Sequence, residues 1–320
     1  MKRSQFKRKM DRLAGRYFFL FCVAILRIMP EGLVYHFSRA IGRFGFFAAR
    51  KHRRLTINNL TKAFKNEKSP QEIKKTALEC FCQISWGAAE TARLALDKKV
   101  HQKLINNVRI EGAEHLDQAL SKKKGAICVS AHFGNFAIMT TRLALEGYPF
   151  TLVMRFADDP VVTELWQEVM KNIGIKVISA RPRRKAVVES LRWLRDGKPL
   201  CLHSDQNKTD GVYVNFFGRP AGTVEGPARL HLRTGAPLLC AFIIRTSRTK
   251  HKIVITPQLD IKLTGDEQKD VHNITKAFTA EIEKIVRRYP EQWWWVHHRW
   301  KGAERLKQKS SDAATAAKKK

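Results

Sequence analysis

The stretch between residues 108 and 256 alternates short apolar runs with segments of helical spacing, and this alternation constrains the fold more than any other feature. Strands are predicted at 127–130, 151–154, 176–178, 200–203, 238–244 and 253–256. Between them, helices are predicted at 135–146, 160–172, 184–196 and 225–234. Strands that alternate with helices in this way form a largely parallel sheet with helices on both faces. The sequence therefore predicts an α/β fold with a mostly parallel central sheet.

A capping box begins one further helix ahead of this region. Ser69 is a good N-cap, Pro70 suits the first helical position, and Glu72 lies three residues after the serine. The apolar residues that follow keep helical spacing to about Leu94. A last helix is predicted at 271–288.

The N-terminus is basic and contains one apolar run, at 17–26. A membrane-spanning helix needs about 20 apolar residues, so a short anchor or an interfacial helix is favoured over a full span. No A-x-A-like cleavage site follows, which disfavours a signal peptide, and an ordinary buried helix is the other alternative. We expect membrane-associating helices at 1–55, the α/β domain at 56–303 and a disordered basic tail at 304–320.

The formal charge of +31 comes from 60 Lys and Arg against 29 Asp and Glu. A field of this sign attracts polyanions such as nucleic acid, an anionic membrane surface or an acidic protein. The chain has no RNP-like motif, helix-turn-helix pattern or zinc-ligand spacing, so a membrane function is favoured over RNA binding and no nucleic-acid partner is expected. Its six cysteines complete no metal-binding pattern, so we expect reduced structural thiols and no metal.

His132 lies at the end of a predicted strand, where a helix begins. In an α/β sheet, ligands and chemistry collect at the carboxyl ends of the strands. A neutral imidazole there can take a proton from an alcohol that attacks a carbonyl, if a partner fixes its tautomer. A histidine satisfied by backbone groups is the competing interpretation. Asp205 ends another predicted strand, whereas position 137, five residues after the histidine, is Ala137 and offers no orienting carboxylate.

Two further segments favour a site. The loop at 215–228 leads into a helix, and its backbone N–H groups are able to hold an oxyanion or a phosphate. The segment 293–300 interleaves tryptophans with His297, His298 and Arg299. That composition suits the headgroup boundary of a membrane.

Six blocks in a fixed order resemble the late lipid A acyltransferases of Gram-negative bacteria, within the glycerolipid (lysophospholipid) acyltransferase superfamily. That family carries AHFGNWE, and this chain reads AHFGNFA at 131–137. The other similar blocks are 154–155, 196–197 with 205–206, 216–221, 234–237 and 290–301, and Asn58-Asn59-Leu60 is similar to the family's N-terminal region. The resemblance covers about residues 15–303.

The resemblance implies an O-acyltransferase with His132 as the general base. Arg155 and Asp205 match positions tied to activity, and Arg155 is expected to contact the acceptor phosphate or to maintain the site. The candidate substrate-binding residues are Asn135, Arg219, Glu225 and Gly226, with Gly226 as a possible oxyanion donor.

The same resemblance implies a reaction and its partners. A fatty acyl chain moves from acidic acyl carrier protein to a hydroxyl of a phosphorylated glucosamine lipid, at the anionic cytoplasmic side of the inner membrane. No cofactor is expected besides this acyl donor. Two other functions stay open: acyl-CoA-dependent acylation of another glycolipid or a lysophospholipid, and lipid binding by a catalytically silent relative.

Ala137 stands where the family has the acid that holds the imidazole. We favour a deliberately inactivated form of an acid-containing enzyme, because every other block is intact, and we therefore expect reduced activity. A natural dyad that lost its acid but kept binding is a second explanation. A third is that Asp205 or Glu225 orients His132 instead.

Overall fold

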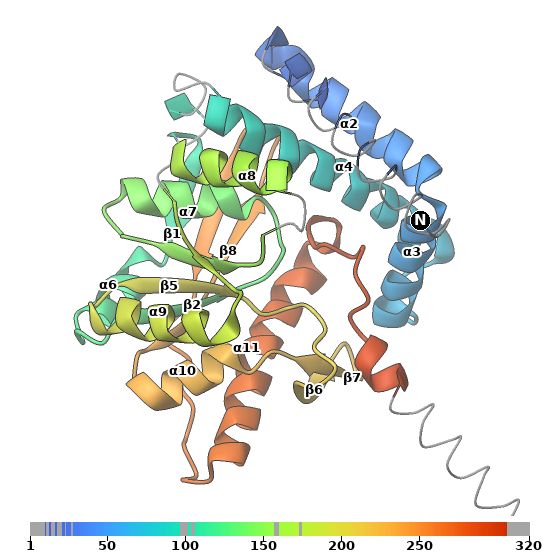
Figure 1. The fold of residues 1–320 in the computed structure, drawn as a ribbon. Coiled ribbons are helices and arrows are strands. Elements are labelled where there is room, and N and C mark those ends of the chain that lie inside the picture. The colour runs from blue at the N-terminus through green and yellow to red at the C-terminus, as the bar shows by residue number, and fades with distance from the viewer. Residues whose placement is uncertain are drawn as a thin grey trace, which may run out of the picture.

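The protein is described by a computed structural model at residues 10, 13, 17, 21, 22, 24–26, 28–96, 102, 103, 106–156, 160–172 and 175–305. Parts of the predicted apolar run 17–26 and most of the predicted tail 304–320 lie outside these residues. The described part confirms an α/β fold with a mostly parallel central sheet and flanking helices (Figure 1).

A seven-stranded sheet with the order β1-β9-β8-β2-β5-β3-β4 forms the centre of the molecule. The strands are β1 (Val108–Glu111), β2 (Ala126–Ser130), β3 (Thr151–Met154), β4 (Lys176–Ser179), β5 (Pro199–His203), β8 (Leu238–Arg245) and β9 (His251–Ile255). Only β8 and β9 pair antiparallel, and all other neighbours in this sheet are parallel. The carboxyl ends of β2, β5 and β3 therefore lie side by side along one edge.

Helices cover both faces of the sheet, and alternate residues of each strand supply two separate hydrophobic cores. Ile127 and Val129 of β2 join α9 (Arg183–Arg195), α10 (Gly226–Thr234) and α11 (Glu267–Arg288) on one face. Cys128 joins α6 (Ala113–Leu120), α7 (Phe136–Leu145) and α8 (Pro160–Asn172) on the other. Strands buried on both faces read as unbroken apolar runs, which is how β2 and β8 were recognised.

Within the part of the chain from residue 31 to the first strand that the structure describes, α2 (Glu31–Ala48), α3 (Arg50–Phe64) and α4 (Pro70–Leu96) precede the sheet. The predicted capping box is present, since Glu72 accepts from Ser69 N–H at 2.7 Å and its own N–H donates to the serine hydroxyl at 3.3 Å. Helix α2 packs closely on α4 because Gly42 has no side chain: a Cβ there would lie 2.6 Å from the Cα of Cys82. Among the described residues, no helix combines the length and apolarity of a membrane span.

The prediction of a loop at 215–228 is wrong for the first half of this segment. It contains an antiparallel hairpin, β6 (Val212–Phe216) with β7 (Arg219–Thr223), before α10 begins. Its two-residue turn is Phe217-Gly218, with φ of 54° and 69°, where such turns normally carry Asn-Gly. Helix α3 also runs across the domain boundary predicted at 55–56.

Candidate active site

His132 lies in a short turn between β2 and α7, and the local sequence dictates the shape of this turn. Gly134 has φ of 57°, and a Cβ at this position would lie 2.1 Å from the carbonyl oxygen of Ile243, so only glycine fits. Asn135 is the N-cap of α7, and its side-chain oxygen accepts from the N–H of Ile138 at 3.2 Å. The turn therefore presents the imidazole at the carboxyl edge of the sheet.

Asp205 is the carboxylate that holds this imidazole. It follows β5, which pairs with β2 so that Ser130 lies opposite His203. Oδ1 of Asp205 lies 2.8 Å from Nδ1 of His132, and Oδ2 accepts from the backbone N–H of His132 at 2.9 Å. Oδ2 also accepts from the indole N–H of Trp293 at 2.7 Å. The carboxylate is thus fully buried, with partners on both oxygens.

The electrostatics of the pair favour a charged carboxylate. Burial opposes both charged forms, but the charge and hydrogen bond of Asp205 outweigh it and raise the pKa of His132 above its usual 6.5. The same interaction holds the pKa of Asp205 well below its usual range. Burial and the neighbouring His132 lower the pKa of His203 to about 3, so this second histidine stays neutral. The anionic Asp205 accepts a hydrogen bond from the N–H at Nδ1 of the neutral His132, which fixes the tautomer in which Nε2 is the basic nitrogen.

Nε2 of His132 is on the accessible side of the ring. The side chain of His132 is 24% exposed, whereas that of Asp205 is completely buried. The amide nitrogen of the exposed Gln206 lies 3.3 Å from Nε2, and the rings of Phe136 and Trp294 stand edge-on to the imidazole. A hydroxyl that displaces Gln206 would meet an unprotonated nitrogen.

An apolar cavity of about 310 Å³ opens beside His132. Helix α4 forms one wall with Ile84, Gly87, Ala88 and Thr91, and Met154 and Met170 contribute from β3 and α8. A Cβ on Gly87 would find its nearest neighbour at 4.0 Å, so this wall has room to spare. The cavity suits an aliphatic chain better than a charged ligand.

A buried ion pair braces the turn that carries His132. Glu90 of α4 receives both guanidinium N–H groups of Arg245 at 2.6 Å each, and both side chains are less than a tenth exposed. Glu90 also accepts from Asn135 at 3.1 Å. The side-chain amide of Gln292 forms hydrogen bonds with the backbone N–H and carbonyl of Arg245. The backbone carbonyl of Gln292 accepts from the N–H of Gly134 at 2.9 Å. Helix α4, β8 and the C-terminal segment are thereby tied to one turn.

Ala137 lies in the first turn of α7, 2% exposed, within the hydrophobic core on the α7 face of the sheet. Its carbonyl accepts from the hydroxyls of Thr140 and Thr141. The position on Nδ1 of His132 that an orienting acid would occupy belongs to Asp205.

The structure brings together only part of the predicted site. Arg155 follows directly on β3, at the same edge of the sheet as His132 and Asp205. Glu225 is paired with Arg229 at 3.1 Å and is not the acid on Nδ1. Three predicted substrate-binding residues lie outside the lining of the cavity beside His132, namely Arg219, Glu225 and Gly226.

The C-terminal tryptophan segment does not form the headgroup surface that its composition suggested. Trp293, Trp295 and Trp300 are each no more than 3% exposed, and Arg299 is 1% exposed. They pack against the β6–β7 hairpin, where Arg299 donates to the carbonyl of Gly222 at 2.8 Å. These side chains can be buried because the three indole N–H groups and the two terminal guanidinium nitrogens of Arg299 have internal acceptors. Only Trp294, among these residues, faces the cavity.

The sequence also matches a known protein family. The sequence profile described as "Bacterial lipid A biosynthesis acyltransferase" matches residues 1–302. The chain belongs to this family. The family resemblance seen in the sequence blocks is thus confirmed, and with it the assignment as an acyltransferase.

Relatives of this acyltransferase have low sequence identity to it but align over most of its length. A phosphatidylinositol mannoside acyltransferase of Mycolicibacterium smegmatis is 27% identical over 72% of this chain and 73% of its own length. A lipid A biosynthesis acyltransferase of Haemophilus influenzae is 24% identical over 88% of this chain and 86% of its own. A lipid A biosynthesis myristoyltransferase of Escherichia coli is 24% identical, covering 80% and 77%.

Proposed function

We propose that the chain transfers a fatty acyl group from acyl carrier protein to a hydroxyl of a phosphorylated glucosamine lipid at the cytoplasmic face of the inner membrane. The observation that carries the proposal is the His132–Asp205 pair, whose histidine lines an apolar cavity. An acyl transfer needs both a base and a slot for the chain, and the two meet here.

The reaction uses His132 first as a base and then as an acid. Nε2 takes the proton of the acceptor hydroxyl as its oxygen attacks the thioester carbonyl, which gives a tetrahedral intermediate. The carbon–sulfur bond then breaks, and the thiolate leaves with the proton that Nε2 had taken. Asp205 stabilises the imidazolium between these steps, because it keeps its negative charge throughout.

The cavity along α4 is assigned to the acyl chain. Gly87→Leu should fill part of it, so kcat/KM for the longest accepted donor should fall about tenfold or more relative to a donor several carbons shorter. Gly87→Ala, whose Cβ fits at 4.0 Å, is the matched control and should change little. Competition assays with acyl donors of mixed length measure this. An equal loss of kcat/KM for donors of all lengths would mean that the acyl chain binds outside this cavity.

Of the explanations for Ala137, we propose that Asp205 has the orienting role. On this proposal the chain is active as it stands, which differs from the reduced activity that the motif alone predicts. Ala137→Glu should change kcat by less than about tenfold and lower the melting temperature, because it buries a carboxylate in an apolar core. Acyl-transfer assays and thermal denaturation check both effects. A gain in kcat of a hundredfold or more would instead favour an inactivated enzyme.

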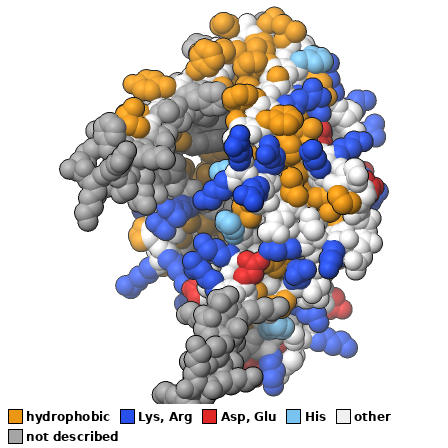
Figure 2. Space-filling model, turned by 90° about the vertical axis from the view of Figure 1, so that its right-hand side faces the viewer, with side chains coloured by type: hydrophobic (Ala, Val, Ile, Leu, Met, Phe, Trp, Pro, Cys, Tyr) orange, Lys and Arg blue, Asp and Glu red, His pale blue; other side chains and the backbone are white. Residues whose placement is uncertain are grey.

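Membrane attachment through α2 is part of the proposal. Leu33, Phe44 and Phe47 on this helix are more than half exposed, and Ile28 just ahead of it is 83% exposed. Figure 2 shows hydrophobic side chains gathered at one end of this side of the molecule, with Lys and Arg beside them. Apolar side chains with basic neighbours suit the surface of an anionic membrane.

A second acceptor is worth testing because relatives named phosphatidylinositol mannoside acyltransferases are as similar to the chain as the lipid A enzymes. The purified full chain should be given acyl carrier protein loaded with a labelled acyl group and, in parallel, a phosphorylated glucosamine lipid or a mannosylated phosphoinositide. Acyl-CoA replaces the carrier in a third arm. Mass spectrometry should show one added acyl chain on the glucosamine lipid. Transfer to the mannoside alone would contradict the proposed acceptor, and transfer from acyl-CoA alone would contradict the proposed donor.

A further inference from the structure

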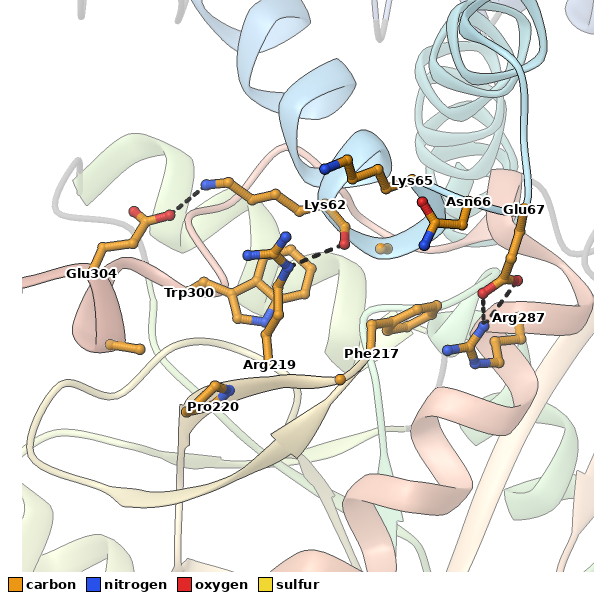
Figure 3. A pocket seen from close by; sticks show the side chains of 13 residues that line it. Lys62, Lys65, Asn66, Glu67, Phe217, Arg219, Pro220, Arg287, Trp300 and Glu304 are labelled. Carbon is orange, nitrogen blue, oxygen red and sulfur yellow. Dashed lines mark hydrogen bonds and ion pairs between the residues drawn. The ribbon is translucent and has the colours of Figure 1, made fainter. Parts of the chain in front are cut away.

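A second cleft, of about 430 Å³, lies away from His132 between the end of α3, the β6–β7 hairpin, α11 and the C-terminal segment (Figure 3). Its rim carries Lys62, Lys65, Arg219 and Arg287. None of its lining residues is shared with the cavity beside His132.

Both carboxylates of this cleft form ion pairs within the chain. Glu304 pairs with Lys62, and Glu67 pairs with Arg287 at 2.8 Å. Arg219 uses its Nε to donate to the carbonyl of Lys62 at 3.2 Å. Within the described part of the chain, neither Lys65 nor the two terminal nitrogens of Arg219 have an acidic partner. The cleft therefore holds two cations that lack internal charge compensation.

The hairpin turn that presents Arg219 adopts a costly backbone conformation. Phe217 has φ of 54°, a conformation that is unfavourable for a bulky residue. Its N–H donates to Glu283 at 2.6 Å, and its ring packs on Phe64 and Trp295. These contacts hold the turn in place, so Arg219 extends from a fixed turn next to the packed rings of Phe217, Phe64 and Trp295.

The cleft lies far from the proposed membrane surface. In Figure 1, α2 leads into one end of α3, and the hairpin and C-terminal segment lie near the other end. A helix of 15 residues is about 22 Å long, which is more than twice the Debye length at physiological salt. Anionic lipid headgroups at α2 are therefore out of reach of Lys65 and Arg219.

We propose that this cleft is the docking site for carboxylates on the surface of the acidic carrier protein that brings the acyl group. This inference depends on the proposed function, which makes the donor an acidic soluble protein. The guanidinium of Arg219 and the ammonium of Lys65 line the same cleft, and both kinds of cation bind carboxylates well. The donor then approaches from the side away from the bilayer, while the lipid acceptor enters from the membrane.

The test compares two double variants of equal charge change in the full chain held in detergent. Lys65→Glu with Arg219→Glu alters the cleft, and Arg192→Glu with Arg195→Glu alters exposed cations on α9. The cleft variant should raise the Kd for fluorescent carrier protein and the KM for its acylated form about tenfold or more, with little change in kcat. The α9 variant should change neither more than twofold. Raised salt should weaken binding of the parent chain and shrink the difference.

Further arms identify the occupant and guard against misfolding. The KM for the lipid acceptor and binding to vesicles of anionic phospholipid should be the same in both variants. A loss confined to these two readouts would assign the cleft to lipid, and equal effects of both variants would overturn the proposal. Lys65→Glu alone, at an exposed position, replaces the double variant if that does not fold.

The binding arm separates this inference from the proposed function. A parent chain that binds the carrier through the cleft but transfers no acyl group would contradict the proposed function only. Transfer that survives with an unchanged KM in the cleft variant would contradict the docking site only.

Discussion

Asp205→Asn is expected to lower kcat about ten-thousand-fold, the size of the loss when the orienting acid of a serine-protease triad is made an amide. Two N–H donors, from Trp293 and the His132 backbone, point at one oxygen of the carboxylate. The amide oxygen must face these donors, so the amide NH₂ faces Nδ1. The imidazole then carries its proton on Nε2 and is unable to act as a base.

The pH dependence gives this variant an independent readout. A base works only when neutral, so kcat/KM of the parent chain should fall as the pH drops through the raised pKa of His132. Without the negative charge of Asp205, burial dominates and the pKa of His132 falls, so the acid limb moves to lower pH. Steady-state rates from pH 5 to 9 measure this. A profile that is unchanged, with kcat within tenfold of the parent, would show that Asp205 does not act on His132.

Glu90→Ala is expected to destabilise the protein by about 3–5 kcal/mol, because it leaves the guanidinium of Arg245 buried without its carboxylate. The guanidinium also lies 3.7 Å from the ring centroid of Trp86, and the side chain of Arg245 is only 6% exposed. Urea denaturation measures the free energy of unfolding. Asn135 loses one acceptor in the same variant, so the turn that holds His132 should loosen as well.

The chain offers a matched control for this variant on the same helix. Glu79 of α4 also binds an arginine through both oxygens, Arg39 at 2.6 and 2.7 Å, but the pair is partly exposed. Glu79→Ala should therefore cost no more than about 1 kcal/mol. Equal losses for the two variants would mean that burial of the Glu90–Arg245 pair has no special consequence.

Much of the fold could be predicted from local patterns, because most of the sheet is buried on both faces. The apolar run of β2 and the capping box at Ser69 are local signals, and both are confirmed. The start of α11 was placed four residues late, although Asp266 caps it by accepting from two backbone N–H groups. The β6–β7 hairpin was missed because Phe217 occupies a turn position that usually carries Asn, and Pro220 interrupts a strand.

The site was only half predictable because its key partnership is not local. His132 was identified from its place at a strand end, but its partner Asp205 lies 73 residues away. Asp205 was among the candidates, whereas Trp293, which fixes its second oxygen, was assigned to a membrane surface. The pairing of Glu90 with Arg245 joins residues 155 positions apart. Only the strand order of the sheet and the packing of α4 bring these groups together.

The most direct test of the central claim is acyl transfer by the purified chain and by its His132→Ala variant. Both receive acyl carrier protein loaded with a labelled acyl group and a phosphorylated glucosamine lipid, and mass spectrometry follows the acceptor. The account predicts that the parent chain adds one acyl chain and that His132→Ala, although folded, adds none above background. Equal transfer by both proteins would contradict the assignment of His132 as the catalytic base.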